Sequence, residues 1–199
     1  MDSKAKIAVF ISGGGTNLQS LIDASKEGRL SAEIVLVVSS KANAYGLERA
    51  KNAGIDTFVF KMKNYPGREE AEKDLLEMLQ EYGVEYIALA GYLKLIPASL
   101  IKKYRHRIAN IHPALLPKYG GKGMYGHHVH EAVIAAGDKE SGATVHIVDE
   151  IYDHGKILIQ EKVPVMPDDD ADKLAARVLK IEHKIYPTAL ENLIRGEEK

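Results

Sequence analysis

The chain has 199 residues, 45% of them apolar and 28% charged, and its 27 basic and 28 acidic residues leave a net charge of -1. This composition predicts one globular domain, 1–199, without the strong positive field that would attract nucleic acid or a membrane surface. The absence of cysteine excludes disulfides, thiolate metal sites and cysteine nucleophiles, and it fits a reducing compartment, so we expect a cytoplasmic protein. Isolated basic clusters are expected to be solvated, as in Lys102, Lys103, Arg105 and Arg107.

Apolar runs alternate with amphipathic runs through the first half of the chain. Strands are predicted at 6–12, 33–39, 56–60, 86–91 and 108–112, and helices at 17–26, 45–53 and 68–82. The run at 33–39 is almost continuously aliphatic, as expected for a strand buried on both faces. The alternation predicts a doubly wound α/β fold with a mostly parallel sheet.

The second half changes character. A helix is predicted at 129–136, and two strands at 144–148 and 157–165 are joined so closely that antiparallel pairing is favoured. The acidic run 168–170 offers an N-cap for a long C-terminal helix, with a kink or break at Pro187. The apolar stripe of this helix is expected to consist of Leu174, Val178, Ile181 and Ile185.

The most informative segment, 110–117, places an amide and an imidazole two residues apart at a strand's end. Side chains at this spacing lie on one face of a strand, about 7 Å apart, and Pro113 ends the pairing. Asn110 can stabilise an oxyanion, and His112 can transfer protons near neutral pH. Because ligands bind where the strands of a parallel sheet end, the pair predicts acyl-type transfer without a covalent nucleophile. A purely structural pair is the plain alternative.

A glycine-rich turn joins the first strand to the first helix. Glycines permit a tight turn, and the free N–H groups of the helix start attract an anion, so 13–17 is a candidate phosphate site. The spacing matches neither the dinucleotide fingerprint nor the P-loop, which favours a phosphomonoester over NAD or ATP. The alternative is an ordinary turn with nothing bound.

The loop that follows the 144–148 strand contains three carboxylates, Asp149, Glu150 and Asp153. One of them beside His112 would orient the imidazole and raise its pKa. Spacing does not choose among the three, although the turn-like residues after Asp153 weakly favour that position.

Other polar residues are expected to be structural or exposed. The histidines His127, His128 and His130 do not converge on one ion at helical spacing, so we expect them at the surface or at the rim of a pocket and predict no metal. Glu182 lies beside the apolar stripe of the last helix and is also expected at the surface.

Together these motifs resemble the glycinamide ribonucleotide formyltransferases, the folate-dependent enzymes of purine biosynthesis. The resemblance runs nearly end to end and rests on 11–19, 90–93, 110–118, 144–146, the Asp153 loop and 182–187. The Asn-x-His-Pro and Leu-Leu-Pro motifs are common to folate formyltransferases, whereas the Ser-Gly-Gly-Gly-Thr-Asn turn singles out the ribonucleotide enzymes. The resemblance implies a Rossmann-like fold, 10-formyltetrahydrofolate as co-substrate, and glycinamide ribonucleotide as the amine that attacks the formyl carbon. The resemblance does not determine the oligomeric state, and a homodimer is one of the alternatives.

The resemblance also implies roles for individual residues. Asn110 would bind the formyl oxygen, His112 would shuttle a proton, and Asp153 would be the catalytic acid. His146 would lie in a second shell near the site, and 120–127 would form a mobile loop beside it. The substrate contacts implied are Gly13, Gly14, Gly15, Thr16 and Asn17 for the phosphate and Glu182 for the ribose and glycinamide end. The folate contacts implied are Arg68, Leu93, Lys94, Leu95, Ile96, Asn110, Val148, Asp149, Glu150 and Asp153.

Three competing functions share part of this pattern. A formyltetrahydrofolate deformylase carries an extra N-terminal domain, which we do not expect because the first strand begins at Lys6. A methionyl-tRNA formyltransferase carries a basic C-terminal RNA-binding domain, which a near-neutral chain ending at Lys199 does not suggest. A phosphate-binding module without catalysis would not need Asn110, His112 and Asp153 together.

Overall fold

The computed structural model describes residues 4–197. The chain divides into two compact units, Met1–Ile108 and Ala109–Lys199, and each is described by itself. The single domain expected from the sequence stays a prediction.

The first unit alternates strands and helices in the predicted order. Its strands are β1 (Ala5–Ile11), β2 (Ala32–Ser39), β3 (Asp56–Val59) and β4 (Tyr86–Leu89). Its helices are α1 (Thr16–Lys26), α2 (Tyr45–Asn52), the 3₁₀ helix η1 (Met62–Asn64), α3 (Arg68–Glu81) and α4 (Ala98–Lys103). Helix α4 was not predicted, because six residues are too few to display a helical period. The basic residues of 102–107 are exposed, as expected.

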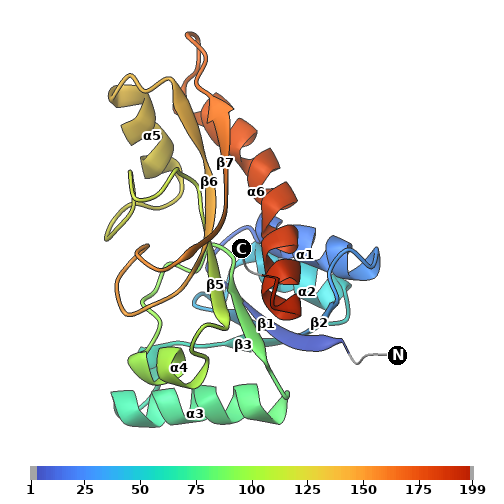
Figure 1. The fold of residues 1–199 in the computed structure, drawn as a ribbon. Helices are drawn as coiled ribbons and strands as arrows, with labels where there is room; N and C mark the ends of the chain where they lie inside the picture. The colour runs from blue at the N-terminus through green and yellow to red at the C-terminus, as the bar shows by residue number, and fades with distance from the viewer. Residues whose placement is uncertain (1–3, 198–199) are drawn as a thin grey trace. The chain divides into compact units, whose positions relative to one another are not determined.

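The four strands of this unit form a parallel sheet in the order β3-β2-β1-β4. Figure 1 shows α1 and α2 on one side of these strands and α3 and α4 on the other. Residues 7–11 of β1 are fully buried, since neighbouring strands and helices cover them on every side. The predicted parallel α/β arrangement is confirmed in this unit, and β1 leads directly into the glycine-rich turn.

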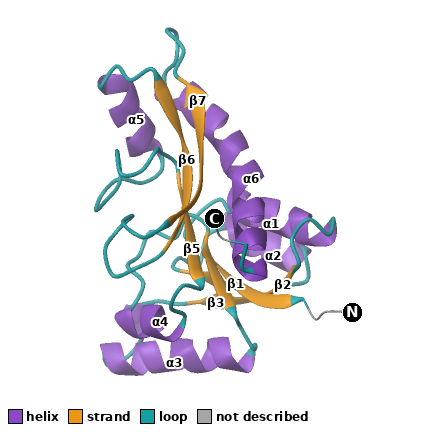
Figure 2. Ribbon diagram, in the orientation of Figure 1, coloured by secondary structure: helices purple, strands orange, loops and turns teal. Residues whose placement is uncertain are grey.

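The second unit is built on antiparallel strands (Figure 2). It contains β5 (Ile108–His112, whose first residue closes the first unit), α5 (His127–Ala135), β6 (Glu140–Ile147), β7 (Ile157–Pro164) and α6 (Ala171–Arg195). Strand β6 pairs antiparallel with both β5 and β7. The antiparallel β6–β7 pair confirms the prediction, and β6 starts earlier than expected because Glu140 pairs with Pro164. The pairing of β5 with β6 was not foreseen, since β5 was placed among parallel strands.

Helix α6 runs alongside β6 and β7 (Figure 1). Asp170 caps its first turn by accepting a hydrogen bond from the N–H of Lys173 at 2.8 Å, as the acidic run predicted. The helix continues through Pro187, so the prediction of a break there is wrong. Proline removes one backbone hydrogen bond from the helix. The buried residues Tyr186 and Ala189, which lie before and after Pro187, hold the helix in place.

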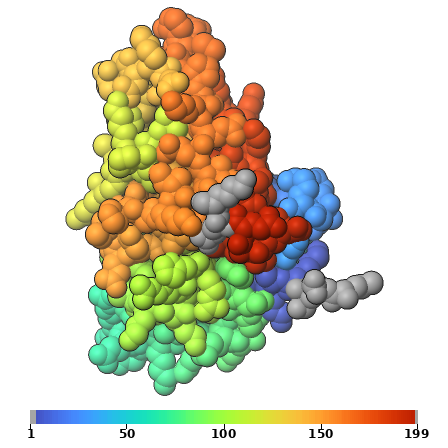
Figure 3. All heavy atoms as spheres, in the orientation of Figure 1, coloured from blue at the N-terminus to red at the C-terminus, as the bar shows by residue number. Residues whose placement is uncertain are grey.

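The surface of the second unit includes much of β7, whose orange atoms are visible in Figure 3. Between residues 4 and 197, no helix is both long and apolar enough to cross a membrane.

Candidate active site

The turn between β1 and α1 leaves its first glycines open. Gly13 and Gly14 are exposed, and a Cβ built on either would meet no heavy atom within 4 Å. Gly15 caps α1 with a φ of 70°, in the left-handed region that glycine adopts at little cost. The helix starts at Thr16, so its first N–H groups face this end of the turn. The turn therefore leaves two open glycines beside the first N–H groups of a helix.

Helix α2 supports this turn. The N–H of Gly46 donates to the carbonyl of Gly13 at 3.0 Å, and Nε of Arg49 donates to the carbonyl of Gly14 at 2.9 Å. A Cβ on Gly15 would lie 2.6 Å from Cα of Gly46, so the two backbones approach closely only because both residues are glycine. The contribution of α2 was not visible in the sequence, because it comes from a segment about 30 residues away.

The segment after β4 contains four of the ten residues expected to contact folate. Leu93 and Leu95 are 44% and 56% exposed, and Lys94 between them is also exposed. Ile96 is only 4% exposed, so its side chain belongs to the core. Arg68 is exposed at the start of α3.

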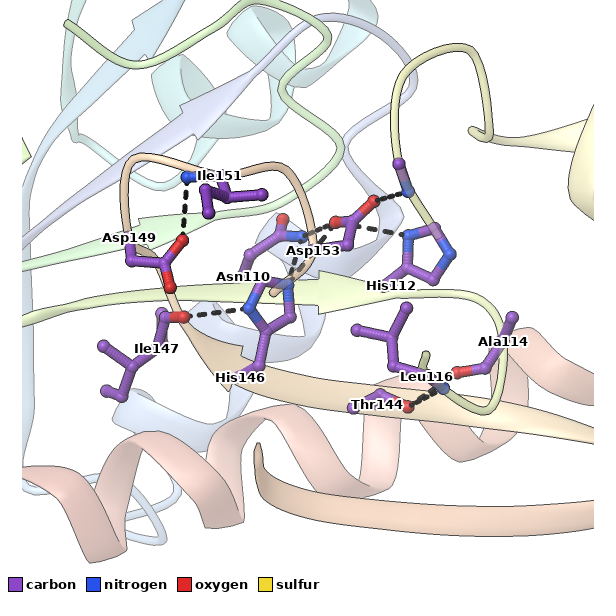
Figure 4. A network of polar contacts seen from close by, with 12 residues as sticks. Asn110, His112, Ala114, Leu116, Thr144, His146, Ile147, Asp149, Ile151 and Asp153 are labelled. Atoms are coloured by element: carbon purple, nitrogen blue, oxygen red, sulfur yellow. Dashed lines mark hydrogen bonds and ion pairs between the residues drawn. The ribbon is translucent and has the colours of Figure 1, made fainter. Parts of the chain in front are cut away.

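In the second unit an amide and two imidazoles converge on one carboxylate oxygen (Figure 4). Oδ1 of Asp153 lies 3.5 Å from Nδ2 of Asn110 and 3.7 Å from Nδ1 of His112. It also lies 3.5 Å from Nε2 of His146, which faces Asn110 across the β5–β6 pair. Asn110 and His112 reach the same oxygen because they share one face of β5, as their spacing predicts.

The Ile147 carbonyl fixes the tautomer of His146, and His146 in turn orients the Asn110 amide. A carbonyl can only accept, so Nδ1 of His146 donates to the Ile147 carbonyl at 2.9 Å. In neutral His146 the other nitrogen, Nε2, then accepts from Nδ2 of Asn110 at 3.1 Å. One amide hydrogen of Asn110 is thereby held, whereas the contact of Nδ2 with Asp153 is long enough to be weak. The second hydrogen can be donated to a ligand.

Asp153 is held in an unusual conformation. Its φ of 53° lies in the left-handed region, which costs most residues about 1–2 kcal/mol and Asp or Asn less. Its Oδ2 accepts from the N–H of Gly121 at 2.8 Å. Burial favours a higher pKa for the Asp153 carboxyl, but the nearby imidazoles of His146 and His112 and the Gly121 N–H together hold that pKa below its usual value. Asp153 is therefore an ionised carboxylate near neutral pH.

His112 is buried, with 4% of its surface exposed. Its Nε2 donates to the carbonyl of Tyr119 at 2.8 Å. Burial lowers the pKa of the imidazole below its usual 6.5, although Asp153 and the Tyr119 carbonyl act in the opposite direction. His112 is therefore neutral near pH 7, with its free electron pair on Nδ1.

The loop before β7 resolves the choice among three carboxylates. Asp149 accepts from the N–H of Ile151 at 2.8 Å and pairs with His154 at 2.9 Å, so it is engaged within its own loop. Glu150 is exposed, and Val148 is half-buried. Asp153 is thus the carboxylate beside His112.

An exposed position at the surface, which was expected for His130 and Glu182, is wrong for both residues. His130 is 4% exposed, because it lies with Val133 on the buried side of α5, and burial lowers its pKa to about 4. Glu182 is 8% exposed, because the buried stripe of α6 passes through positions 182, 185, 186 and 189. His127 and His128 are exposed, as expected. Across residues 4–197, no group of three or more His, Cys, Asp or Glu is arranged to hold a metal ion.

The sequence analysis missed two residues of the site, Tyr119 and Gly121. Both contact the cluster through the backbone, by a carbonyl and an N–H respectively. Contacts through the backbone do not depend on residue type, so the sequence does not predict them. Only the glycines of 120–126 indicated an irregular loop there.

Similarity to known proteins agrees with this geometry. A family model described as formyl transferase matches residues 5–190. The chain is 48% identical over 191 residues to the chloroplastic phosphoribosylglycinamide formyltransferase of Vigna unguiculata, covering 96% of this chain and 61% of that protein. It is 44% identical to the phosphoribosylglycinamide formyltransferase of Haemophilus influenzae, covering 96% and 88%. The chain thus spans about three fifths of the plant relative and most of the bacterial one.

Solved structures give the same answer. Glycinamide ribonucleotide transformylase 1 from Symbiobacterium toebii matches with a TM-score of 0.91 and 39% identity, over 98% of this chain and 90% of that one. The predicted fold class, a mostly parallel doubly wound sheet with an antiparallel C-terminal pair and a long last helix, is confirmed. The resemblance to the formyltransferases is confirmed as well, and the chain belongs to the formyl transferase family.

Proposed function

We propose that this protein transfers the formyl group of 10-formyltetrahydrofolate to the amino group of glycinamide ribonucleotide. The observation that carries the proposal is the convergence of one amide and two imidazoles on Asp153, in a chain of the formyl transferase family. The relatives with this named activity share 44–48% of its sequence. An amide donor, a neutral imidazole and an ionised carboxylate are the groups that formyl transfer to an amine needs.

Asn110 acts on the formyl oxygen. Negative charge grows on that oxygen as the amine nitrogen adds to the formyl carbon. Nδ2 of Asn110 has one hydrogen held by His146 and a second that is only weakly engaged, so the second can be donated to the growing charge. Loss of one such donor typically lowers kcat by about 10²- to 10³-fold.

His112 and Asp153 carry the proton. Neutral His112 accepts at Nδ1 the proton that the attacking amine loses. The imidazolium so formed lies 3.7 Å from the carboxylate of Asp153, which stabilises it. The same proton reaches N10 of the folate as the bond between N10 and the formyl carbon breaks, so that the formylated ribonucleotide and tetrahydrofolate are released with protons balanced.

The remaining contacts are assigned from the resemblance and from exposure. The turn at 13–17 is proposed to bind the phosphate, because Gly13 and Gly14 are open at the start of a helix. The exposed Leu93 and Leu95 are proposed to contact the pterin. Glu182 is proposed to bind the ribose and glycinamide end of the ribonucleotide.

The test is a folate-conversion assay with and without glycinamide ribonucleotide. Ribonucleotide-dependent conversion to tetrahydrofolate, lost in Asn110→Ala and His112→Ala, is expected. The matched controls Asn52→Ala and His128→Ala change the same residue types at exposed positions and should keep full activity. Release of formate without the ribonucleotide would indicate a deformylase instead, and no conversion in either case would refute the proposal.

A further inference from the structure

The neutral form of His112 can carry its hydrogen on either ring nitrogen, and one contact decides which. The Tyr119 carbonyl accepts from Nε2 at 2.8 Å, which leaves the electron pair on Nδ1, the nitrogen 3.7 Å from Asp153. If Nδ1 carried the hydrogen instead, it could not accept a proton. The position of one backbone carbonyl therefore sets the nitrogen that is basic.

The backbone conformation of Tyr119 is not one that the residue prefers by itself. Its φ of 58° lies in the left-handed region, where a non-glycine residue persists only if its surroundings hold it. Tyr119 follows Pro117 in a loop between β5 and α5. The carbonyl thus needs an anchor outside the loop.

Asp138 supplies the anchor from the turn between α5 and β6. Its Oδ2 accepts from the hydroxyl of Tyr119 at 2.8 Å and from Nζ of Lys118 at 2.5 Å. Nζ of Lys118 also lies 5.2 Å from the centre of the Tyr119 ring. The hydrogen bonds from Lys118 and Tyr119 hold the pKa of Asp138 below its usual value, so the anchor is charged near neutral pH.

We infer that Asp138 is a positioning residue for the reaction: by fixing Tyr119 it keeps the Tyr119 carbonyl on Nε2 of His112 and the basic Nδ1 available for the proton. The effect of Asp138 on catalysis rests on the proposed function. The effect of Asp138 on the His112 ring is structural and does not depend on the proposed function. The titratable groups that act on His112 are Asp153, His146 and, from α5, His130.

The experiment measures the His112 ring directly. Nitrogen chemical shifts of the full-length protein labelled with ¹⁵N-histidine report the tautomer and the pKa of each imidazole. In Asp138→Ala the fraction of His112 with hydrogen on Nδ1 should rise, and the pKa of His112 should fall, because the Tyr119 carbonyl raises it. Tyr119→Phe, which removes only the hydroxyl, should act in the same direction. Asp138→Asn keeps an acceptor oxygen and should largely restore the wild-type signals.

Kinetics supply the second readout. In Asp138→Ala, kcat for formyl transfer to glycinamide ribonucleotide should fall about 3- to 10-fold, the effect of one hydrogen bond, while both KM values stay within about twofold. Glu140→Ala is the matched control, since it breaks the exposed ion pair with Lys162 in the same unit and should change neither kcat nor the His112 signals.

The outcomes separate the two proposals. An unchanged His112 tautomer and pKa in both folded variants, Asp138→Ala and Tyr119→Phe, overturn the inference, even if kcat falls. If the wild-type protein forms no formylated ribonucleotide, the proposed function fails, while the nitrogen shifts still decide whether Asp138 positions His112.

Discussion

Replacement of Thr144 by valine tests how the chain after His112 is held in place. The buried hydroxyl of Thr144 donates to the carbonyl of Ala114 at 2.6 Å and accepts from the N–H of Leu116 at 3.1 Å (Figure 4). Valine has nearly the same shape but no hydroxyl, so both buried backbone groups lose this partner. A buried group left without a partner costs about 1–3 kcal/mol, so for the two groups the free energy of unfolding should fall by about 2–6 kcal/mol.

The assay is denaturation in urea, with Thr188→Val as the matched control. The Thr188 hydroxyl donates to the Lys184 carbonyl at an exposed position of α6, where water can replace it, so its loss should cost less than about 0.5 kcal/mol. Thr144→Ser keeps the hydroxyl and should recover most of the stability. Equal stability of Thr144→Val and Thr188→Val would refute the reasoning.

Three further predictions address catalysis, binding and acid stability. Asp153→Asn should keep the fold, since asparagine tolerates a φ of 53°, but should lower kcat about 10²- to 10⁴-fold; turnover near the wild-type value contradicts the role of the carboxylate. Gly14→Val places a side chain in the open turn and should weaken binding of glycinamide ribonucleotide by about tenfold in calorimetry, and an unchanged Kd removes the phosphate site from this turn. The hydrogen bond from Arg177 holds the pKa of Asp169 at about 2, below its usual 3.8. The stabilisation by this ion pair is therefore complete above about pH 4 and is lost as the pH falls toward 2. In acid denaturation, the difference in stability between wild type and Asp169→Asn should close over that range. A difference that stays constant with pH contradicts the pairing.

Local patterns predicted those elements whose periodicity is long and regular. Strand β2 and helix α3 have almost the predicted bounds, because each spans enough residues to show which side is buried. The six-residue helix α4 was missed for the opposite reason. The stripe predicted on α6 is right at Leu174, Val178 and Ile185, which are buried. Glu182 was missed, because a buried carboxylate is too rare to be expected from its residue type.

The sequence alone determined the chemical groups of the candidate site and part of its geometry. The spacing of Asn110 and His112 put them on one face of β5, because side chains alternate along a strand. Spacing could not choose Asp153 over Asp149, since both lie in one short loop at similar distances along the chain. That choice depends on the left-handed backbone of Asp153 and on which loop groups already have partners.

Only the tertiary structure decided which nitrogen of His112 is basic. The deciding contacts come from the Tyr119 carbonyl and, behind it, from Asp138 in a turn 19 residues further along the chain. A backbone carbonyl is present at every residue, so its placement cannot be read from residue types. It is set by how the loop after β5 is held against the turn before β6, and that arrangement exists only in the folded chain.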